Sequence, residues 1–80
     1  MPTIFRYDGF RFFFYSNEGD PRELVHVHVR KGGGEAKFWV EPEISLALSA
    51  GFDARTLRAI GRIVEDNADR IKDAWHDHFG

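Results

Sequence analysis

The amino-acid sequence predicts an α+β protein in which a small, mainly antiparallel sheet of four to five strands packs on a long C-terminal helix. Between residues 3 and 40, short runs of alternating or aromatic residues are separated by turn signals, which is typical of strands. From Asp53 onward the apolar residues recur about every 3.6 positions, which indicates an amphipathic helix. Because 80 residues can bury only one core, we expect a single domain, residues 1–80.

The first two strands are predicted at residues 3–7 and 10–15, which are rich in aromatic and β-branched side chains. Asp8-Gly9 separates them, and this dipeptide is preferred in the two-residue turn of a β-hairpin. The second run is apolar on both faces over most of its length, which is expected of a strand that is covered on both sides. The second cover is either a curl of the same sheet or another subunit.

The third strand is predicted at residues 24–30, where the alternation is strict. Successive side chains of a strand point to opposite faces, so this run has an apolar side and a polar side. The apolar side carries Val25, Val27 and Val29, and the polar side carries His26, His28 and Arg30. One face is therefore predicted to be core and the other to be solvated or functional.

The remaining strands follow from turn signals. Residues 16–23 are polar and contain Gly and Pro, so they are predicted to form a loop. Three glycines after Lys31 favour a tight reversal, and residues 35–40 alternate again as a fourth strand. After the break at residues 41–43, residues 44–48 fit a short fifth strand or one helical turn, and we choose the strand.

The helix is predicted to begin after Asp53, which is a good N-cap residue. Phe52 and Leu57 flank it at the spacing of a hydrophobic staple. One continuous helix to about Phe79 is the simplest interpretation. Gly61 and Asn67 are weak helix formers and mark the two places where it could bend or break.

Composition restricts the classes of partner. The formal net charge of −2, from 11 basic and 13 acidic residues, gives no general footprint for nucleic acid or membranes. We find no signal peptide and no transmembrane span, so we expect a cytoplasmic protein. A small domain without cysteine cannot use disulfides, and eight Phe, two Trp and two Tyr supply apolar surface, so we expect a homodimer.

The two histidines of the third strand raise the question of a metal site. His26 and His28 project to one side about 6–7 Å apart, so they can converge on one ion, but two ligands do not make a site. The acidic and histidine residues that would supply a third ligand are Asp20, Glu23, Glu35, Glu41, His76 and His78. No spacing selects among them, and His76 and His78 are better explained by favourable interaction of an imidazolium with a helix C-terminus. We therefore predict no metal and no cofactor.

The same histidines also have a catalytic interpretation. His26 or His28 can act as general acid or base beside Arg30 and Lys37, as in metal-independent RNA cleavage, where a cation stabilises the negative charge of the phosphorane. Tyr15 and Trp39 would then stack on bases, although aromatic residues on strands more often belong to a core or an interface. The sequence has no nucleophile motif and no dinucleotide fingerprint, so whether the protein is an enzyme stays open.

Several segments together resemble a widespread bacterial family of small proteins that is catalogued only as a domain of unknown function. These segments are Pro2-Thr3-Ile4, His26-Val27-His28-Val29, Glu35-Ala36-Lys37-Phe38-Trp39 and residues 74–80. Family members commonly read Pro-Pro-His-x-His before this strand, whereas here four residues separate Pro21 from His26. The rigid Pro-Pro approach is therefore missing from this chain, while the His-x-His itself is retained.

The resemblance implies a partner, because genes of the family often lie beside that of another small protein in a toxin–antitoxin-like arrangement. We expect a small intracellular bacterial protein that binds the product of a neighbouring gene, with Tyr15 and Trp39 at the contact. The alternative is an RNA-directed toxin that uses His26 or His28 with Arg30 and Lys37.

Overall fold

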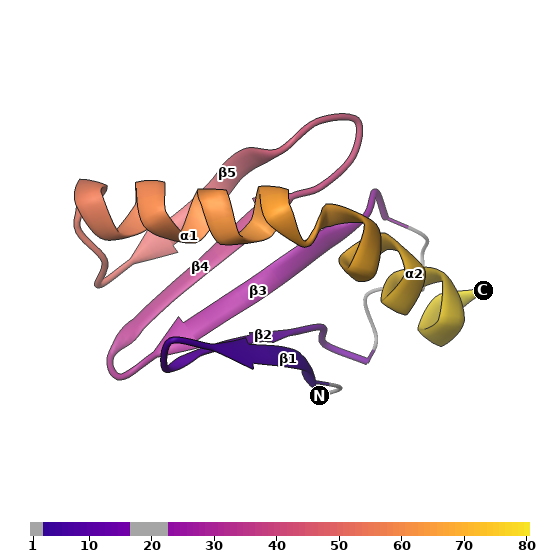
Figure 1. Cartoon of the computed structure of the whole chain (residues 1–80), viewed down its shortest axis with the longest axis horizontal. Coiled ribbons are helices and arrows are strands. Elements are labelled where there is room, and N and C mark those ends of the chain that lie inside the picture. Colours follow the sequence, from indigo (N-terminus) through magenta and orange to yellow (C-terminus); the bar gives the residue numbers. More distant parts are fainter. Residues whose placement is uncertain (1–2, 17–22) are drawn as a thin grey trace.

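The computed structural model describes residues 3–16 and 23–80, which form one open antiparallel sheet and two helices that lie on one side of it (Figure 1). The strands neighbour one another in sequence order from β1 to β5. They are β1 (Thr3–Tyr7), β2 (Phe10–Phe13), β3 (His26–Lys31), β4 (Gly34–Trp39) and β5 (Ser45–Ala50). The helices are α1 (Ala54–Asp66) and α2 (Ala68–Phe79). The α+β class and the antiparallel sheet are confirmed.

The β1–β2 hairpin turns as predicted at Asp8-Gly9. Both residues have positive φ, 52° at Asp8 and 80° at Gly9, as a type I′ turn requires. The strand β2 ends at Phe13 instead of Tyr15, because the next two residues leave the ladder. Most of the loop predicted at residues 16–23 lies outside the described residues.

The predicted β3–β4 hairpin forms through the glycine run, and the predicted fifth strand is confirmed. Bounds shift by one or two residues: β3 begins at His26 instead of Leu24, and β5 spans Ser45–Ala50 instead of 44–48. Val25 still takes part outside the regular ladder, because its carbonyl accepts from the backbone amides of Val40 at 2.8 Å and Glu41 at 3.3 Å. A register shift interrupts the β4–β5 ladder at Lys37/Phe38.

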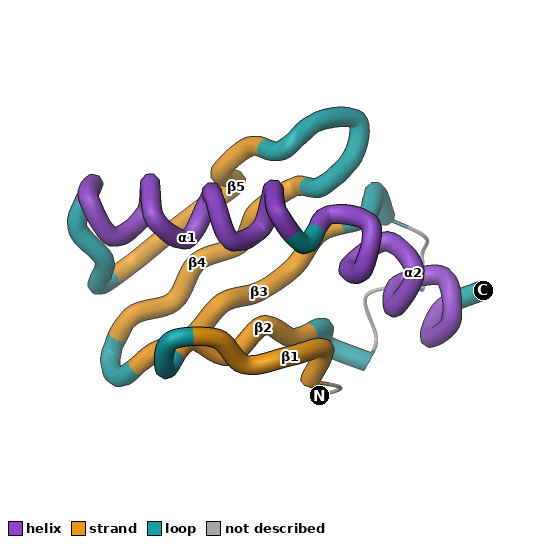
Figure 2. Tube along the Cα trace, in the orientation of Figure 1, coloured by secondary structure: helices purple, strands orange, loops and turns teal. Residues whose placement is uncertain are grey.

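The core lies between the sheet and the two helices, and both helices lie along the same face of the sheet (Figure 2). The three valines of the third predicted strand are buried in it, as the alternation predicts. Other buried members include Phe12 and Phe38 from the strands, Phe14 just after β2, and Ile60, Val64, Ile71 and Trp75 from the helices. The side chains alternate because each strand presents every second residue to the helices.

The prediction of one continuous helix is wrong, because the helix breaks at Asn67. Its backbone, at φ −113° and ψ 16°, leaves the helical region. Its side-chain Nδ2 donates to the carbonyl of Ile63 at 2.8 Å, and its backbone amide is shared between Ile63 and Val64. A side chain that bonds the preceding turn competes with the helix, so the chain changes direction there. Gly61, the other suspected position, stays helical.

The predicted start of the helix is confirmed. Asp53 is the N-cap, and its Oδ1 accepts from the backbone amide of Thr56 at 2.7 Å. Within the described part of the chain, neither helix is long and apolar enough to cross a membrane.

Candidate binding face

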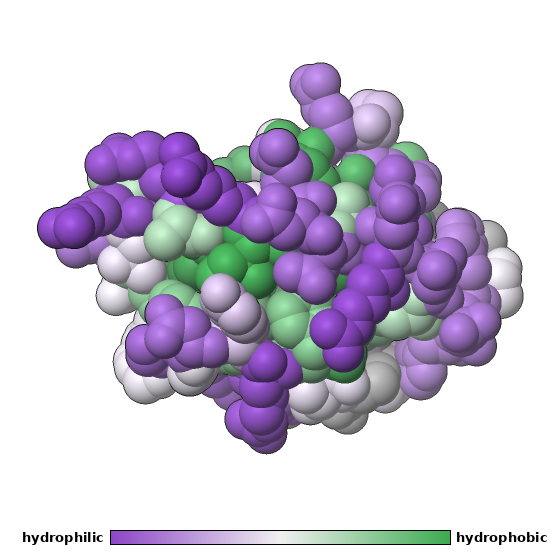
Figure 3. Space-filling model, viewed as in Figure 1, coloured by the Kyte–Doolittle hydropathy of each residue, from purple (hydrophilic) through white to green (hydrophobic). Residues whose placement is uncertain are grey.

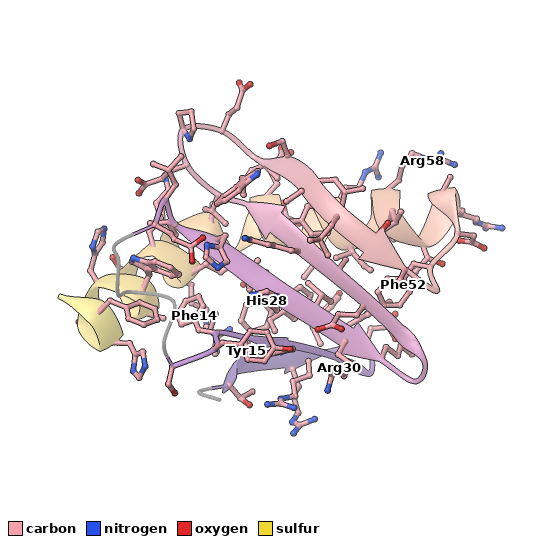
Figure 4. All side chains as sticks on the ribbon, turned by 180° about the vertical axis from the view of Figure 1, so that it is seen from behind. Phe14, Tyr15, His28, Arg30, Phe52 and Arg58 are labelled. Carbon is pink, nitrogen blue, oxygen red and sulfur yellow. The ribbon has the colours of Figure 1, made fainter. Side chains whose placement is uncertain are left out.

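The second face of the sheet carries the predicted functional residues, and no described helix covers it. Figure 4 views the sheet from this side, with the strands in front of the helices and Tyr15, His28 and Arg30 on the near side. We call it the aromatic face and define it by Arg11, Phe13, Tyr15, His26, His28, Arg30, Glu35, Lys37 and Trp39. It is built by residues that alternate with the core residues along β2, β3 and β4.

Cross-strand register arranges this face in rows. One row runs across four strands from Phe13 through His28 and Lys37 to Leu48. A second row runs from Arg11 through Arg30 and Glu35 to Ala50, and a third pairs His26 with Trp39. Directly opposed side chains interact most strongly, so the rows bring aromatic rings and a carboxylate next to cations.

His28 lies at the centre and is enclosed by rings. Its imidazole stacks on Phe13 at 5.6 Å between centroids, and it forms T-shaped contacts with Tyr15 and His26 at centroid distances of 4.6 and 5.3 Å. Only 8% of His28 is exposed, and Phe13 beside it is fully buried. The prediction of a solvated polar side therefore holds for Arg30 but not for the histidines.

His26 joins the aromatic face to the core. Its ring is fully buried and contacts Trp39 on the aromatic face and Trp75 of α2, at 5.4 and 4.9 Å between centroids. Its Nδ1 lies 2.9 Å from the carbonyl of Leu24, and since a carbonyl only accepts, Nδ1 carries the proton. The described contacts of His26 are those of a structural residue.

The polar atoms around the rings are paired. The Tyr15 hydroxyl donates to Glu35 Oε1 at 3.0 Å, and Arg30 Nη2 donates to the same oxygen at 3.3 Å. Lys37 lies 4.4 Å from the centroid of Trp39 and 3.7 Å from a carboxylate oxygen of Glu23. These contacts hold the side chains in place, which lowers the entropy that a partner would have to remove on binding.

A third cation, Arg11, lies at the β2 side of the aromatic face. The Arg11 guanidinium lies 4.5 Å from the centroid of Phe13, and its Nε donates to Thr3 Oγ1 at 3.0 Å. The outer layer of the aromatic face therefore consists of three cations, the Glu35 carboxylate and the partly exposed rings of Tyr15 and Trp39.

All six residues predicted as catalytic or partner-binding lie on this face: His26, His28, Arg30, Lys37, Tyr15 and Trp39. Sequence reasoning missed Arg11 and Phe13, and it considered Glu23 and Glu35 only as possible metal ligands. Arg11, Phe13 and Tyr15 alternate within residues 10–15, and the phenylalanines between them hide this signal. The position of Glu35 opposite Arg30 follows from the hairpin register.

Two other features are separate from the aromatic face. Among residues 3–16 and 23–80, no three His, Asp or Glu side chains are grouped to hold a metal ion. A hollow of about 550 Å³ lies at the start of α1 and the tip of the β3–β4 hairpin, bounded by Phe10, Lys31, Phe52, Thr56 and three glycines. It contains none of the predicted site residues.

The fold and this face define a class: small α+β proteins with a five-stranded antiparallel meander, helices on one face and an aromatic, cationic second face. Within that class, the chain belongs to the family described as "Domain of unknown function (DUF4160)", which matches residues 9–76. Neither the curated proteins nor the solved structures contain a match to this chain.

Proposed function

We propose that this chain is a small intracellular bacterial binding module, whose aromatic face recognises a partner protein encoded by a neighbouring gene of a toxin–antitoxin-like pair. The observation that carries the proposal is the difference in exposure across the face. His26 and His28 are enclosed, whereas Tyr15 and Trp39 remain partly exposed beside Arg30 and Lys37. The accessible part of the face is suited to contact more than to proton transfer.

The accessible chemistry is that of a protein interface. Tyr, Trp and Arg are the residue types enriched at the sites that dominate binding energy, because they combine large apolar area with polar atoms. Leu48 extends the row of Lys37 onto β5 and is 57% exposed, which adds apolar area at the margin. Two arginines on the face, Arg11 and Arg30, favour a partner surface that carries carboxylates.

The buried rings support this surface from below. Phe13, His28 and His26 form a continuous layer under the accessible side chains, down to Trp75 in the core. Rigid support of this kind keeps the exposed side chains of Tyr15 and Trp39 in one geometry, so less conformational entropy is lost when a partner binds.

The test compares two exposed aromatic residues on different parts of the molecule. We expect Trp39→Ala to weaken binding of the neighbouring gene product about 30-fold, the loss typical of a central aromatic anchor. Tyr7→Ala is the matched control. Tyr7 is 57% exposed, but it lies on the opposite side of β1 from Thr3 and Arg6, whose side of the strand continues the aromatic face. Calorimetry on purified proteins gives both affinities. Equal affinities for the two variants would contradict the proposed surface.

A second candidate function is an RNA-directed toxin, and one observation favours it. His28 lies directly across from Lys37 in the β3–β4 ladder, with Arg30 on the same face, which places an imidazole near two cations. Catalysis would require His28 to become accessible to substrate.

Expression of the chain without its neighbour discriminates the two functions. If expression arrests growth, and His28→Ala removes the arrest while circular dichroism and oligomeric state are unchanged, the chain is a catalytic toxin. We expect His28→Ala to retain whatever effect the folded wild-type chain has on growth.

A further inference from the structure

The outward side of the two helices carries charges in two separate blocks. Hydrophilic side chains follow both helices in Figure 3, on the side away from the sheet. Seven of the exposed charged residues recur every three or four positions, which places them along one face of each helix, whereas the exposed Glu65 and Arg70 lie outside this spacing. We call them the charge stripe, which consists of Arg55, Arg58, Arg62, Asp66, Asp69, Asp73 and Asp77. The first three are basic and the last four are acidic.

Most of these charges are unfavourably placed with respect to the dipoles of the helices that carry them. Arg55 and Arg58 lie near the N-terminus of α1, where the helix dipole disfavours positive charge, and the first turn holds no acidic residue. Asp77 lies in the last turn of α2, where negative charge is disfavoured. Only Asp69, in the first turn of α2, is placed favourably.

The arginines form no ion pair within the described chain, although Arg55 and Arg58 lie close enough to Asp53 to help lower its pKa. None of the ion pairs or side-chain hydrogen bonds between residues 3–16 and 23–80 involves Arg55, Arg58 or Arg62. They border a shallow hollow of about 250 Å³ with Ala59, whose small side chain permits close approach to α1. Three adjacent cations that are exposed and outside any ion pair raise the question of what neutralises them.

The charge stripe of one copy is complementary to the charge stripe of a second copy that runs in the opposite direction. The pairs Arg62/Asp69 and Arg58/Asp73 share one midpoint, between Glu65 and Asp66, and Arg55/Asp77 is displaced from it by half a residue. A two-fold axis at this midpoint places the basic block of each copy opposite the acidic block of the other copy. Arg62 of both copies would flank the acidic residues that meet at the axis.

We propose that two copies of this chain associate antiparallel through the charge stripes of α1 and α2. A two-fold arrangement satisfies both blocks at once, because each residue pair then occurs twice. A nucleic acid would be attracted to the arginines and repelled by four aspartates, and an acidic protein segment would leave those aspartates unpaired. The aromatic face lies on the other side of the sheet and stays open, so this association is independent of the proposed partner.

The association is weak and sensitive to salt. Exposed ion pairs contribute little individually, and the stripe presents no large exposed apolar residue to its partner. The change of direction at Asn67, visible in Figure 1, concentrates contact on the two central pairs. We therefore expect dissociation constants between micromolar and millimolar at low salt, and a marked weakening at about 0.5 M salt, where charges are screened within a few ångströms.

Charge reversal within the stripe tests the arrangement. In R58D the pair 58/73 becomes two carboxylates, and in D73R it becomes two guanidinium groups. We expect each single variant to self-associate about tenfold more weakly than wild type in sedimentation velocity at low salt. The double variant R58D/D73R carries both charges reversed, and we expect it to regain wild-type affinity.

An equimolar mixture of the two single variants gives the sharpest result. The R58D chain carries a carboxylate at both positions 58 and 73, and the D73R chain carries a guanidinium at both. In a mixed dimer, each of the two 58/73 pairs therefore joins one carboxylate to one guanidinium, as in wild type. We expect the mixture to associate about as tightly as wild type, although each variant alone does not. Antiparallel pairing predicts a mixture that associates like wild type and single variants that associate more weakly. A parallel arrangement, which sets each position against its own copy, would place like charges together in wild type and in each single variant, so it predicts a mixture tighter than wild type and single variants no weaker than wild type.

Matched control variants distinguish an effect of charges within the stripe from an effect of the net charge of the chain. R6D changes the formal net charge from −2 to −4, as R58D does, and E43R changes it to 0, as D73R does. Both residues are exposed and lie outside the helices. We expect both controls to associate like wild type. A 9.2 kDa species alone up to millimolar concentration, or equal affinities in all variants and the mixture, would overturn the proposal.

Discussion

Two of the three successive glycines of the β3–β4 turn are required as glycine, for different reasons. Gly32 has φ of 57°, a conformation that other residues rarely adopt. A Cβ on Gly34 would collide with the ring of Phe52, whereas a Cβ on Gly33 would meet nothing within 4 Å. The sequence predicts a turn from all three residues equally and does not reveal that Gly34 is required by the packing of Phe52.

We predict that Gly34→Ala lowers the free energy of unfolding by about 1–3 kcal/mol, because the ring of Phe52 must move from its place against the core. Gly33→Ala should change it by no more than about 0.5 kcal/mol. Urea denaturation of both variants measures the difference. Equal destabilisation would mean that the Phe52 ring does not pack against Gly34 in solution.

His26 and the exposed His76 provide a second comparison at the residue scale. We predict that His26→Ala lowers the free energy of unfolding by about 2–4 kcal/mol, because it leaves a cavity between Trp39 and Trp75. His76→Ala, at an exposed position on α2, should cost less than about 0.5 kcal/mol. Thermal denaturation of both proteins checks this, and a small cost for His26→Ala would contradict its structural role.

The sequence predicts which way the side chains of β3 point but not how far they are buried. Strict alternation is enough to assign Val27 to the core and His28 to the other face. Burial of His28 depends on Tyr15, and burial of His26 depends on Trp75, far along the chain. Contacts between such distant residues have no local signal, so the sequence predicts six members of the candidate site but neither Phe13 and Arg11 beside them nor the geometry of the site.

The start of α1 allows a prediction of pH dependence at the element scale. The hydrogen bonds from Thr56 hold the pKa of Asp53 below its ordinary value of 3.8, with smaller help from Arg55 and Arg58. A lowered pKa in the folded state means that the cap stabilises the protein above about pH 4 and loses this effect as the pH falls through the folded pKa.

We therefore expect wild type to melt at a higher temperature than Asp53→Ala at neutral pH, with a difference that shrinks below about pH 4. Asp53→Asn retains the cap without titrating, so its advantage over Asp53→Ala should stay constant with pH. Melting temperatures of the three proteins between neutral and acidic pH test this. A constant difference between wild type and Asp53→Ala would show that the carboxylate does not act as the cap.

Elements are predicted well where local chemistry determines them. Asp8-Gly9 and Asp53 act through their own backbone geometry, and both fulfil their predicted roles. The break at Asn67 is one of two possibilities that the sequence leaves, because Gly61 has an even lower helix propensity. Packing decides between them: Gly61 faces Phe38 within the core layer, whereas the Asn67 side chain bonds the carbonyl of Ile63.

At the scale of the whole molecule, two helices on one side of a five-stranded sheet leave one broad surface to solvent or to partners. A two-layer domain has only one core, so the aromatic face needs its own internal packing to remain ordered. Stacked rings and paired charges supply that packing. The neighbouring gene product as partner and the self-association of the chain stay predictions, and they use opposite sides of the molecule.

The most direct test of the aromatic face is an NMR titration of the isotope-labelled chain with the purified neighbouring gene product. We predict that the resonances of Tyr15, Lys37 and Trp39, including the Trp39 indole N–H, change on binding, while those of Arg58 and Asp73 do not. Perturbations confined to α1 and α2, or no perturbation at saturating partner, would contradict the claim that this face is the recognition surface.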